Sequence, residues 1–250
     1  MDLRVGDRTI EGVGLVVFDK DGTLIELHRY WSRMVALRAR LIAQALGLER
    51  KREAGLVRAL GVDAASGRLR PEGPVGLKPR EVVAQAAVDF LDASGCPDTR
   101  QSCVAAFARA DEISSGDIGR FVKPTPGAQE LIAALHAAGC RVAVATVDRS
   151  DRARLALDFL GLSGRIDLVA GGEQVRRTKP DPEMLERVLE KLGEAPSRTV
   201  MVGDALTDLE MGRAAGVKAC IGVLTGFATR AQALRFTPYV VRDLTELRAA

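Results

Sequence analysis

The sequence has few aromatic residues and no long hydrophobic run. Aromatic residues make up only 4% of the chain, too few for the stacking surfaces of proteins that bind single-stranded nucleic acids. No run of about 18 apolar residues occurs, so a membrane-spanning helix is not expected. The first residues, MDLRVGDRTIEG, carry charges where a secretion signal would be apolar. We therefore expect a cytoplasmic protein with no nucleic-acid partner and no membrane association.

The sequence also lacks an excess of one charge and any regular cysteine spacing. It has 36 basic and 33 acidic residues, a near balance that suits a small anionic ligand better than a nucleic acid. The four cysteines do not have the spacing of a metal site, and no secretory context favours disulfides, so reduced thiols are expected. The composition allows a monomer or a homodimer.

Short apolar runs alternate with helical segments at the start and in the second half of the chain. The first run, Val13–Phe18, is rich in valine and apolar on both faces, as in a buried parallel strand. Similar runs recur at Cys140–Thr146, Asp167–Ala170, Thr199–Val202 and Ala219–Val223. Helices are expected between them at Gly127–Ala138 (capped by Thr125-Pro126), Arg152–Leu160, Asp181–Gly193 and Leu206–Ala215. This alternation predicts an α/β fold with a doubly wound, mostly parallel sheet.

A long helical segment separates the first two predicted strands. Asp19 and Thr146 are separated by more than half of the 250 residues, far more than a simple crossover needs. Four helices are expected there, at Tyr30–Leu46, Arg50–Leu60, Pro79–Ala93 and Thr99–Ile113. We predict an α/β core of residues 1–27 and 120–250 with an inserted helical cap of residues 28–119. One enlarged domain is the alternative. Residues 1–11 are compatible with an edge strand or a hairpin.

Polar residues stand directly after the predicted strands, where open α/β sheets bind their ligands. These residues are Asp19, Lys20, Asp21, Gly22, Thr23, Thr146, Lys179, Gly203, Asp204 and Asp208. Each is ordinary by itself, but they occur in order at one edge of the predicted sheet. Carboxylates that lie close together repel unless a cation compensates them, and oxygen ligands beside a phosphate suit Mg²⁺. The pattern therefore predicts a magnesium site that binds a phosphate group.

These residue types can carry out phosphoryl transfer. Asp19 can act as a carboxylate nucleophile, which is a recognised covalent strategy. Asp21 can protonate the leaving alcohol and later activate water. Lys179 can stabilise the charge on the phosphate and on the nucleophile, while the hydroxyl of Thr146 can donate a hydrogen bond.

Four motifs resemble the ordered motifs of the haloacid dehalogenase superfamily. They are FDKDGTL (Phe18–Leu24), Thr146 at a strand end, Lys179 in TKPDP, and GDALTD (Gly203–Asp208). The resemblance implies a Rossmann-like core with an α-helical cap. It also implies a Mg²⁺-dependent phosphatase for a small phosphorylated metabolite, and it is strongest to phosphoglycolate phosphatase-like enzymes, which makes phosphoglycolate one candidate.

The resemblance also implies residue roles. Asp19 would form an aspartyl-phosphate, Asp21 would be the acid and base, and Lys179 would stabilise charge. The phosphate would be bound by Thr146, Gly22 and Thr23. The metal would be held by Asp19, the backbone carbonyl of Asp21 and Asp204, with Asp208 either a direct ligand or bound to the metal through water. The sequence departs from the family in having Val147 where an Asn often follows the Thr.

The sequence leaves several alternatives open. Lys78 and Arg80, in a Gly/Pro-rich link, are candidates for contacting an anionic substrate. The basic residues of the first two insert helices are expected to form a solvated face; they are Arg33, Arg38, Arg40, Arg50, Lys51 and Arg52. The functional alternatives are a phosphomutase resembling β-phosphoglucomutase and a non-catalytic protein that binds a phosphorylated ligand.

Overall fold

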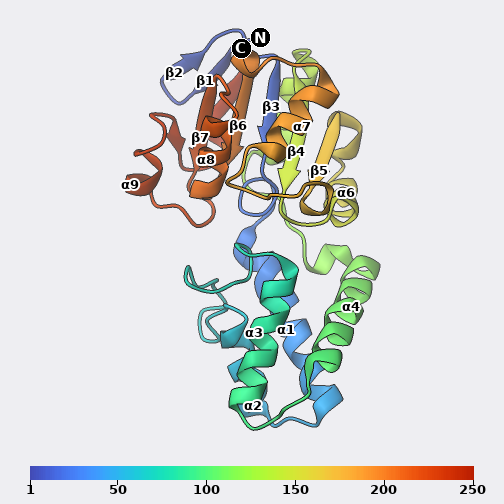
Figure 1. Ribbon diagram of the computed structural model, residues 1–250. Helices are drawn as coiled ribbons and strands as arrows, with labels where there is room; N and C mark the ends of the chain where they lie inside the picture. Colours follow the sequence, from blue (N-terminus) through green and yellow to red (C-terminus); the bar gives the residue numbers. More distant parts are fainter. The chain divides into compact units, whose positions relative to one another are not determined.

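The computed structural model describes residues 1–250 and contains two compact units (Figure 1). An α/β unit consists of Met1–Leu27 and Lys123–Ala250, and a helical unit consists of His28–Val122. The insert was predicted at residues 28–119, and the helical unit begins at the same residue and ends slightly later, at Val122. Whether the helical unit acts as a cap stays a prediction.

A six-stranded parallel sheet forms the centre of the α/β unit. Its order is β5-β4-β3-β6-β7-β8, with all neighbours parallel. The strands are β3 (Leu15–Phe18), β4 (Arg141–Thr146), β5 (Leu168–Gly171), β6 (Thr199–Gly203), β7 (Ala219–Val223) and β8 (Val240–Val241). This arrangement confirms the predicted doubly wound α/β fold. The two-residue strand β8 was not predicted.

Strand β3 occupies the point where the order of the sheet changes direction. From β3 the chain adds β4 and β5 on one side and β6, β7 and β8 on the other. All four residues of β3 are buried, and Phe18 is in register with Val144 of β4 and Val202 of β6. Ligands of open α/β sheets bind beyond the carboxyl ends of strands at such a switch point. The residues that follow β3, β4 and β6 therefore lie next to one another at the same edge of the sheet.

Helices cover both faces of this sheet, as Figure 1 shows. They are α5 (Ala128–Ala137), α6 (Ser150–Phe159), α7 (Glu183–Leu192), α8 (Leu206–Ala214) and the short α9 (Arg230–Ala233). Helix α7 is strongly amphipathic, and its buried Met184, Leu185 and Val188 pack in one core with Leu15 and Val17 of β3. Short 3₁₀ turns lie at η1 (Ile118–Arg120), η2 (Ser163–Arg165), η3 (Gly172–Gln174), η4 (Pro196–Arg198) and η5 (Leu244–Glu246).

The start of α5 differs from the prediction that Thr125 caps it and Pro126 opens it. The helix begins after Gly127, which adopts the left-handed conformation with φ 84°. Thr125 has other partners, because its N–H donates to the carbonyl of Leu24 at 3.0 Å and its hydroxyl donates to the carbonyl of Thr23. Thr125 therefore attaches this segment to the loop after β3 and is not available as a helix cap.

The two segments that join the helical unit to the α/β unit are paired with each other. The N–H of Glu26 donates to the carbonyl of Lys123 at 2.9 Å, and the two side chains form an ion pair with 2.7 Å between Nζ and Oε1. Ile25 and Pro124 form an antiparallel bridge beside them. The chain thus leaves the α/β unit and returns to it along adjacent paths.

The N-terminal residues form a hairpin that does not join the main sheet. Strands β1 (Leu3–Val5) and β2 (Arg8–Ile10) pair with the C-terminal β9 (Leu247–Ala249) in a separate antiparallel sheet of order β2-β1-β9. The sequence allowed for the hairpin but did not reveal its partner, because β9 is only three residues long and lies at the other end of the chain.

The helical unit contains α1 (Leu27–Leu46), α2 (Arg50–Ala59), α3 (Arg80–Ala93) and α4 (Arg100–Gly116). Helix α3 packs against both α2 and α4. All four helices overlap the predicted segments, because the apolar positions recur with helical periodicity. None of the helices in the structure is both long and apolar enough to span a membrane.

The prediction of a solvated basic face was wrong for Arg38. This side chain is only 4% exposed, and its guanidinium lies 4.3 Å from the ring centre of Phe107 and 5.6 Å from that of Trp31. Its Nη2 is 3.6 Å from Oδ1 of Asp111, which also pairs with Arg80. The aromatic faces and the carboxylate together compensate the buried positive charge. The other five basic residues of the cluster are exposed, as predicted.

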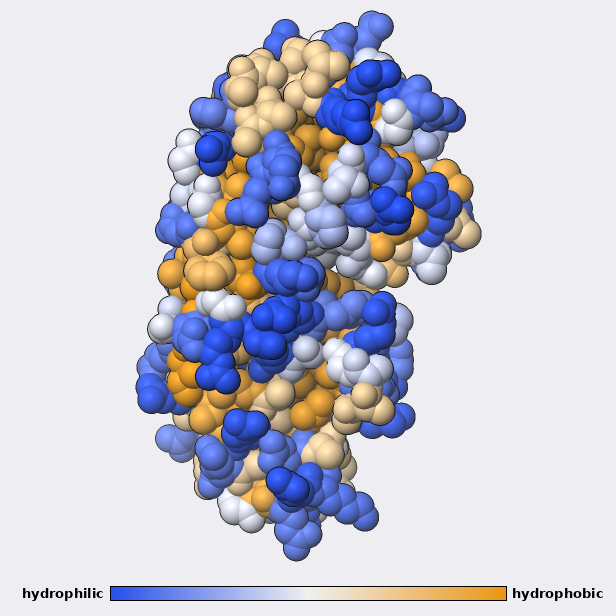
Figure 2. Space-filling model, turned by 180° about the vertical axis from the view of Figure 1, so that it is seen from behind, coloured by the Kyte–Doolittle hydropathy of each residue, from blue (hydrophilic) through white to orange (hydrophobic).

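The surface does not concentrate its apolar residues on a single element. Figure 2 shows hydrophilic and apolar residues interspersed over the face that it displays. The most exposed large apolar side chains, Val82, Val104, Phe159 and Leu234, come from four separate segments. Single exposed apolar residues of this kind are ordinary on protein surfaces. A monomer or a homodimer stays a prediction.

We expect Asp111→Asn to lower the free energy of unfolding of the helical unit by about 2 kcal/mol, because the buried Arg38 loses its carboxylate. This value is reduced from that of a fully buried pair because the Asp111 side chain is 22% exposed. Trp31 is the only tryptophan, so its fluorescence during urea unfolding reports on this unit.

Glu112→Gln is the matched control on the next residue of α4. Glu112 pairs with Arg109 where the two side chains are 65% and 62% exposed, so its neutralisation should change stability by less than about 0.5 kcal/mol. Equal effects of Asp111→Asn and Glu112→Gln would contradict the structural role of the buried charge.

Candidate active site

Lys179 lies between two carboxylates at the carboxyl edge of the sheet. Its Nζ donates to Oδ1 of Asp19 at 2.6 Å and to Oδ1 of Asp208 at 2.7 Å. Asp19 directly follows β3, Asp208 lies in the first turn of α8, and Lys179 comes from the loop before α7. Burial disfavours the charged ammonium, but the two carboxylates outweigh burial and raise the pKa of Lys179 above its ordinary value. The lysine is therefore a fixed positive charge beside Asp19.

Asp204 is packed against two glycines with little room to move. A methyl group at Gly22 would lie 2.4 Å from its carboxyl carbon, and one at Gly226 would lie 1.7 Å from its Oδ2. The carboxylate accepts hydrogen bonds from the hydroxyl of Thr23 at 3.1 Å and from the N–H of Phe227 at 3.2 Å. Gly22 has φ 97°, which favours glycine there. The close fit fixes the direction of the Asp204 carboxylate.

Asp19, Asp204 and Asp208 form a buried cluster in which one carboxylate oxygen from each residue lies within 4.8 Å of the other two. Burial, followed by the charges of Asp19 and Asp208, raises the pKa of Asp204 well above its ordinary value. Burial also raises the pKa of Asp208 to about 6, although Lys179 opposes this shift. Three hard oxygen donors under mutual repulsion fit a divalent cation such as Mg²⁺, which would relieve that repulsion.

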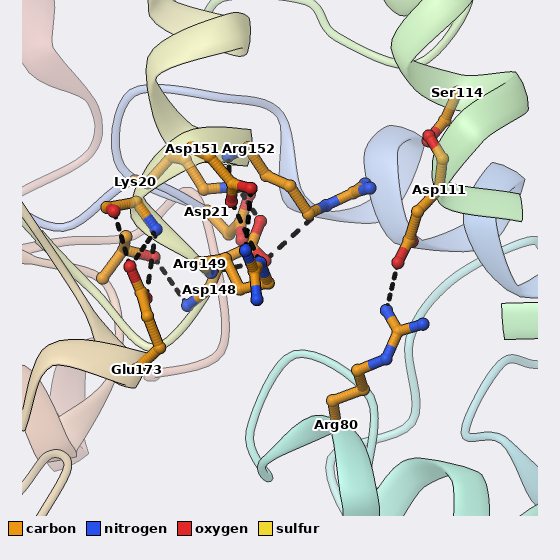
Figure 3. Close-up of polar contacts among 12 residues, drawn as sticks. Lys20, Asp21, Arg80, Asp111, Ser114, Asp148, Arg149, Asp151, Arg152 and Glu173 are labelled. Carbon is orange, nitrogen blue, oxygen red and sulfur yellow. Dashed lines mark hydrogen bonds and ion pairs between the residues drawn. The ribbon is translucent and has the colours of Figure 1, made fainter. Parts of the chain in front are cut away.

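The side chain of Asp21 faces a different group of residues (Figure 3). Its Oδ1 accepts a hydrogen bond at 2.8 Å from Nζ of Lys20, which also donates to Oδ2 of Asp148 at 3.0 Å. Burial raises the pKa of Asp21 to about 6, with Lys20 lowering it and Asp148 raising it. For Asp148, the attraction of Lys20 and Arg152 exceeds the effect of burial and lowers its pKa. Asp21 thus adjoins the cluster in sequence, but its carboxylate is held by Lys20.

The remaining core residues of the predicted site lie at the same edge of the sheet. Thr146 is the last residue of β4, and its hydroxyl accepts a hydrogen bond from the N–H of Asp148 at 3.1 Å. Gly22 and Thr23 are buried in the loop after β3, where the hydroxyl of Thr225 donates to the carbonyl of Gly22. The structure therefore groups Thr146, Gly22 and Thr23 around the ends of β3 and β4.

Lys78 and Arg80 belong to the helical unit. Lys78 is exposed, just before α3. Arg80 is held inside the unit, because its guanidinium pairs with Asp111 and lies 5.5 Å from the ring centre of Phe107. A contact of either residue with a substrate stays a prediction.

Sequence reasoning missed Asp148, Arg152 and the segment after β7. Asp148 had a usable signal, because it stands two residues beyond the strand-ending Thr146 at the edge where ligands bind. The sequence Thr225–Phe227 follows a predicted strand in the same way and supplies contacts to Gly22 and Asp204. Lys20 was among the residues noted after the first strand, but its ion pair with Asp148 could not be read from the sequence, because the two residues are 128 positions apart.

A model of the haloacid dehalogenase-like hydrolase family matches residues 13–216. The matched range begins before β3 and ends after α8, so it contains the carboxylate cluster, Lys179 and Asp21. The four motifs noted in the sequence all lie within it.

Two curated relatives resemble part of the chain. A phosphoglycolate phosphatase of Aquifex aeolicus is 33% identical over 127 residues, which cover 51% of this chain and 60% of that protein. Pyrophosphatase PpaX of Halalkalibacterium halodurans is 33% identical over 131 residues, with the same two coverages. The chain thus matches less than two thirds of the length of either relative.

Solved structures resemble nearly the whole chain. A predicted phosphoglycolate phosphatase of Haemophilus somnus has a TM-score of 0.72 at 21% identity and covers 95% of this chain and 97% of its own. CbbY of Rhodobacter sphaeroides, solved in complex with phosphate, has a TM-score of 0.64 at 22% identity. The match covers 94% of this chain and 96% of CbbY. At these identities the likeness shows a shared fold.

We expect Mg²⁺ to raise the unfolding temperature of the wild-type protein by about 5 °C at a concentration about 100 times its Kd. Asp204→Asn should remove most of this rise, while the metal-free variant should be at least as stable as the wild type because one repelling charge is gone. Asp158→Asn, at an exposed position of α6, is the control that should keep the full response. An Asp204→Asn variant that responds to Mg²⁺ like the wild type would rule out this cluster as the metal site.

We also expect the metal-dependent rise to be larger at about pH 7.5 than at about pH 5. In the metal-free protein the raised pKa values of Asp204 and Asp208 mean that the folded state binds protons that the unfolded chain has already released. The contribution of Asp208 to metal-free stability is therefore present at low pH and is lost as the pH rises through about 6, and the contribution of Asp204 is likewise lost as the pH rises. The cation competes with these protons, so it binds better once they have left. Differential scanning calorimetry at both pH values measures the difference, and an equal response at both would contradict it.

Proposed function

The chain belongs to the haloacid dehalogenase-like hydrolases, and on that basis we propose that it is a Mg²⁺-dependent phosphatase acting on a small phosphorylated metabolite. The observation that carries the proposal is the buried contact between Lys179 and Asp19, beside the cluster that Asp19 forms with Asp204 and Asp208. A carboxylate nucleophile needs a nearby positive charge when it approaches an anionic phosphate, and Lys179 supplies one.

The proposed reaction begins at Asp19. An oxygen of its carboxylate forms a bond to the phosphorus while the bond from phosphorus to the ester oxygen breaks. The leaving oxygen takes a proton from Asp21, so an alcohol departs and an aspartyl-phosphate remains on Asp19. Lys179 and the hydroxyl of Thr146 stabilise the charge on the phosphoryl oxygens.

Hydrolysis of the aspartyl-phosphate restores the protein. Asp21, now ionised, takes a proton from a water molecule as the water oxygen bonds to the phosphorus and the bond to Asp19 breaks. The pKa of about 6 that burial gives Asp21 suits a group that both donates and accepts a proton near neutral pH. Asp19, Asp204, Asp208 and the backbone carbonyl of Asp21 would hold Mg²⁺, which when bound neutralises phosphate charge and orients the phosphoryl group.

The substrate and the role of the helical unit are finer parts of this proposal. Phosphoglycolate is the first substrate to test, because the Aquifex aeolicus relative is a phosphoglycolate phosphatase. The helical unit would act as a cap that limits the access of water during the reaction. Of the two predicted substrate contacts, Lys78 is the better candidate, because its side chain is exposed whereas Arg80 is paired with Asp111.

We expect the protein to release phosphate from p-nitrophenyl phosphate in the presence of Mg²⁺ and to stop when the metal is chelated. Asp19→Asn should lower kcat at least about a thousandfold, because the variant lacks the nucleophile. Mass spectrometry should find one added phosphate on the wild-type peptide that contains Asp19 and should also exclude deamidation of the variant. Asp158→Asn is again the control and should retain wild-type activity.

The other outcomes distinguish the alternatives. Undiminished activity of Asp19→Asn would refute Asp19 as the nucleophile. Slow hydrolysis that a bisphosphorylated sugar accelerates would indicate a phosphomutase. Binding of a phosphate analogue without turnover of any ester, phosphoglycolate included, would indicate a non-catalytic binding protein.

A further inference from the structure

Lys20 is a fully buried lysine that the proposed reaction does not use. Its side chain is only 1% exposed and lies between the carboxylates of Asp21 and Asp148, at 2.8 and 3.0 Å. Removing an ammonium group from water is unfavourable by several kcal/mol unless close partners compensate it. A buried lysine in this position therefore requires both carboxylates, and it joins the loop after β3 to the loop after β4.

Asp148 is itself fixed from several sides. Its Oδ1 accepts a hydrogen bond from the N–H of Arg149 at 2.8 Å and lies 3.7 Å from Nε of Arg152 in α6. Its own N–H donates to the hydroxyl of Thr146, and its carbonyl accepts from the N–H of Gly172 at 3.0 Å. Asp148, in the loop after β4, is thus held by β4, by α6 and by the segment after β5, and through Lys20 it is connected to the carboxylate of Asp21.

The charges alternate along this line of side chains. Arg152 is positive, Asp148 negative, Lys20 positive and Asp21 negative, and each side chain is about nine-tenths buried or more (Figure 3). Each group is attracted to its neighbours in an environment that screens charge poorly. Arg152 lies in α6 and Asp148 follows β4, so this line of ion pairs connects both elements to the carboxylate of Asp21.

We propose that Lys20 and Asp148 are positioning residues that hold the carboxyl group of Asp21 in the geometry needed to protonate the leaving oxygen. This inference rests on the proposed phosphatase function. A proton donor that is displaced by about 1 Å can lose much of its effect on the rate, so groups that fix it contribute to catalysis without touching the substrate. The departing alcohol is the reaction component that depends on this proton.

A purely structural role for the same residues predicts a different result. If Lys20 and Asp148 only joined two loops, their loss would disturb Asp19 as well as Asp21 and would slow all substrates alike. If they position the proton donor, the loss depends on the leaving group. A nitrophenolate ion departs without protonation, whereas an alkoxide departs only with a proton.

The test compares kcat/KM for p-nitrophenyl phosphate and for β-glycerophosphate, because this constant reports the step in which the alcohol leaves and not the later attack of water. We expect Asp148→Asn and Lys20→Met to lower kcat/KM for β-glycerophosphate by about tenfold to a hundredfold and that for p-nitrophenyl phosphate by less than about threefold. Asp21→Asn should lower kcat/KM for β-glycerophosphate by a larger factor than these variants do, again with a smaller loss for p-nitrophenyl phosphate.

Asp151→Asn is the matched control for Asp148→Asn. Asp151 lies in the first turn of α6, three residues after Asp148, and pairs with Arg149 where the side chains are 62% and 58% exposed. Both constants should therefore stay at wild-type values. Should the single variants fail to fold, the double variant Lys20→Met/Asp148→Leu removes both buried charges together and should fold, with the same selective loss.

Three results would overturn the inference. If a folded Asp148→Asn or double variant lost the same factor in kcat/KM for both esters, these residues would have a structural role only. If kcat/KM were unchanged for both esters, they would have no role in catalysis. In both cases the proposed function would stand. A wild-type protein that hydrolyses neither ester nor phosphoglycolate would instead refute the proposed function, and the positioning role with it.

Discussion

Charge burial at the carboxyl edge of the parallel sheet is the constraint on which this molecule depends. Asp19, Asp204 and Asp208 are withdrawn from water within a few ångströms of one another. Lys179 compensates two of them directly, whereas Asp204 receives its hydrogen bonds from a hydroxyl and a backbone amide. A fold tolerates such a group only if the surrounding elements hold it rigidly or a cation joins it. Next to the cluster, the buried carboxylates of Asp21 and Asp148 are likewise compensated by a positive charge, that of Lys20.

The order of the strands explains how these charges come together. The chain places β3 at the centre of the sheet and adds neighbours on both sides, so residues from distant parts of the sequence follow adjacent strands. Asp19 and Asp204 follow β3 and β6, and Thr146 and Asp148 come from the end of β4. Strands β3, β4 and β6 are buried and only four to six residues long. This length is enough to form the site, because the site residues come from the carboxyl end of each strand and from the loop that follows it.

Much of this arrangement could be predicted from the sequence. The strands are valine-rich runs, the insert helices have clear periodicity, and the polar residues after each strand mark the site. What escaped prediction depends on contacts distant in sequence. Arg38 looked like a surface residue because its burial requires Asp111 and Phe107, which lie on another helix. Thr125 looked like a helix cap because its true partners, Leu24 and Thr23, lie across the insert. Lys20 and Asp148 are adjacent only once β3 and β4 have paired.

The pairing of Glu26 with Lys123 and of Ile25 with Pro124 makes the helical unit modular. Because the chain departs and returns at neighbouring positions, the path of the α/β unit is nearly continuous without the insert. A segment of another length or sequence could replace residues 28–122 with little strain on the strands that carry the carboxylates, since only the two paired ends must meet. The junction constrains the insert only at its two ends, so the length and sequence of the insert can vary while the residues after β3, β4 and β6 keep their places in the α/β unit.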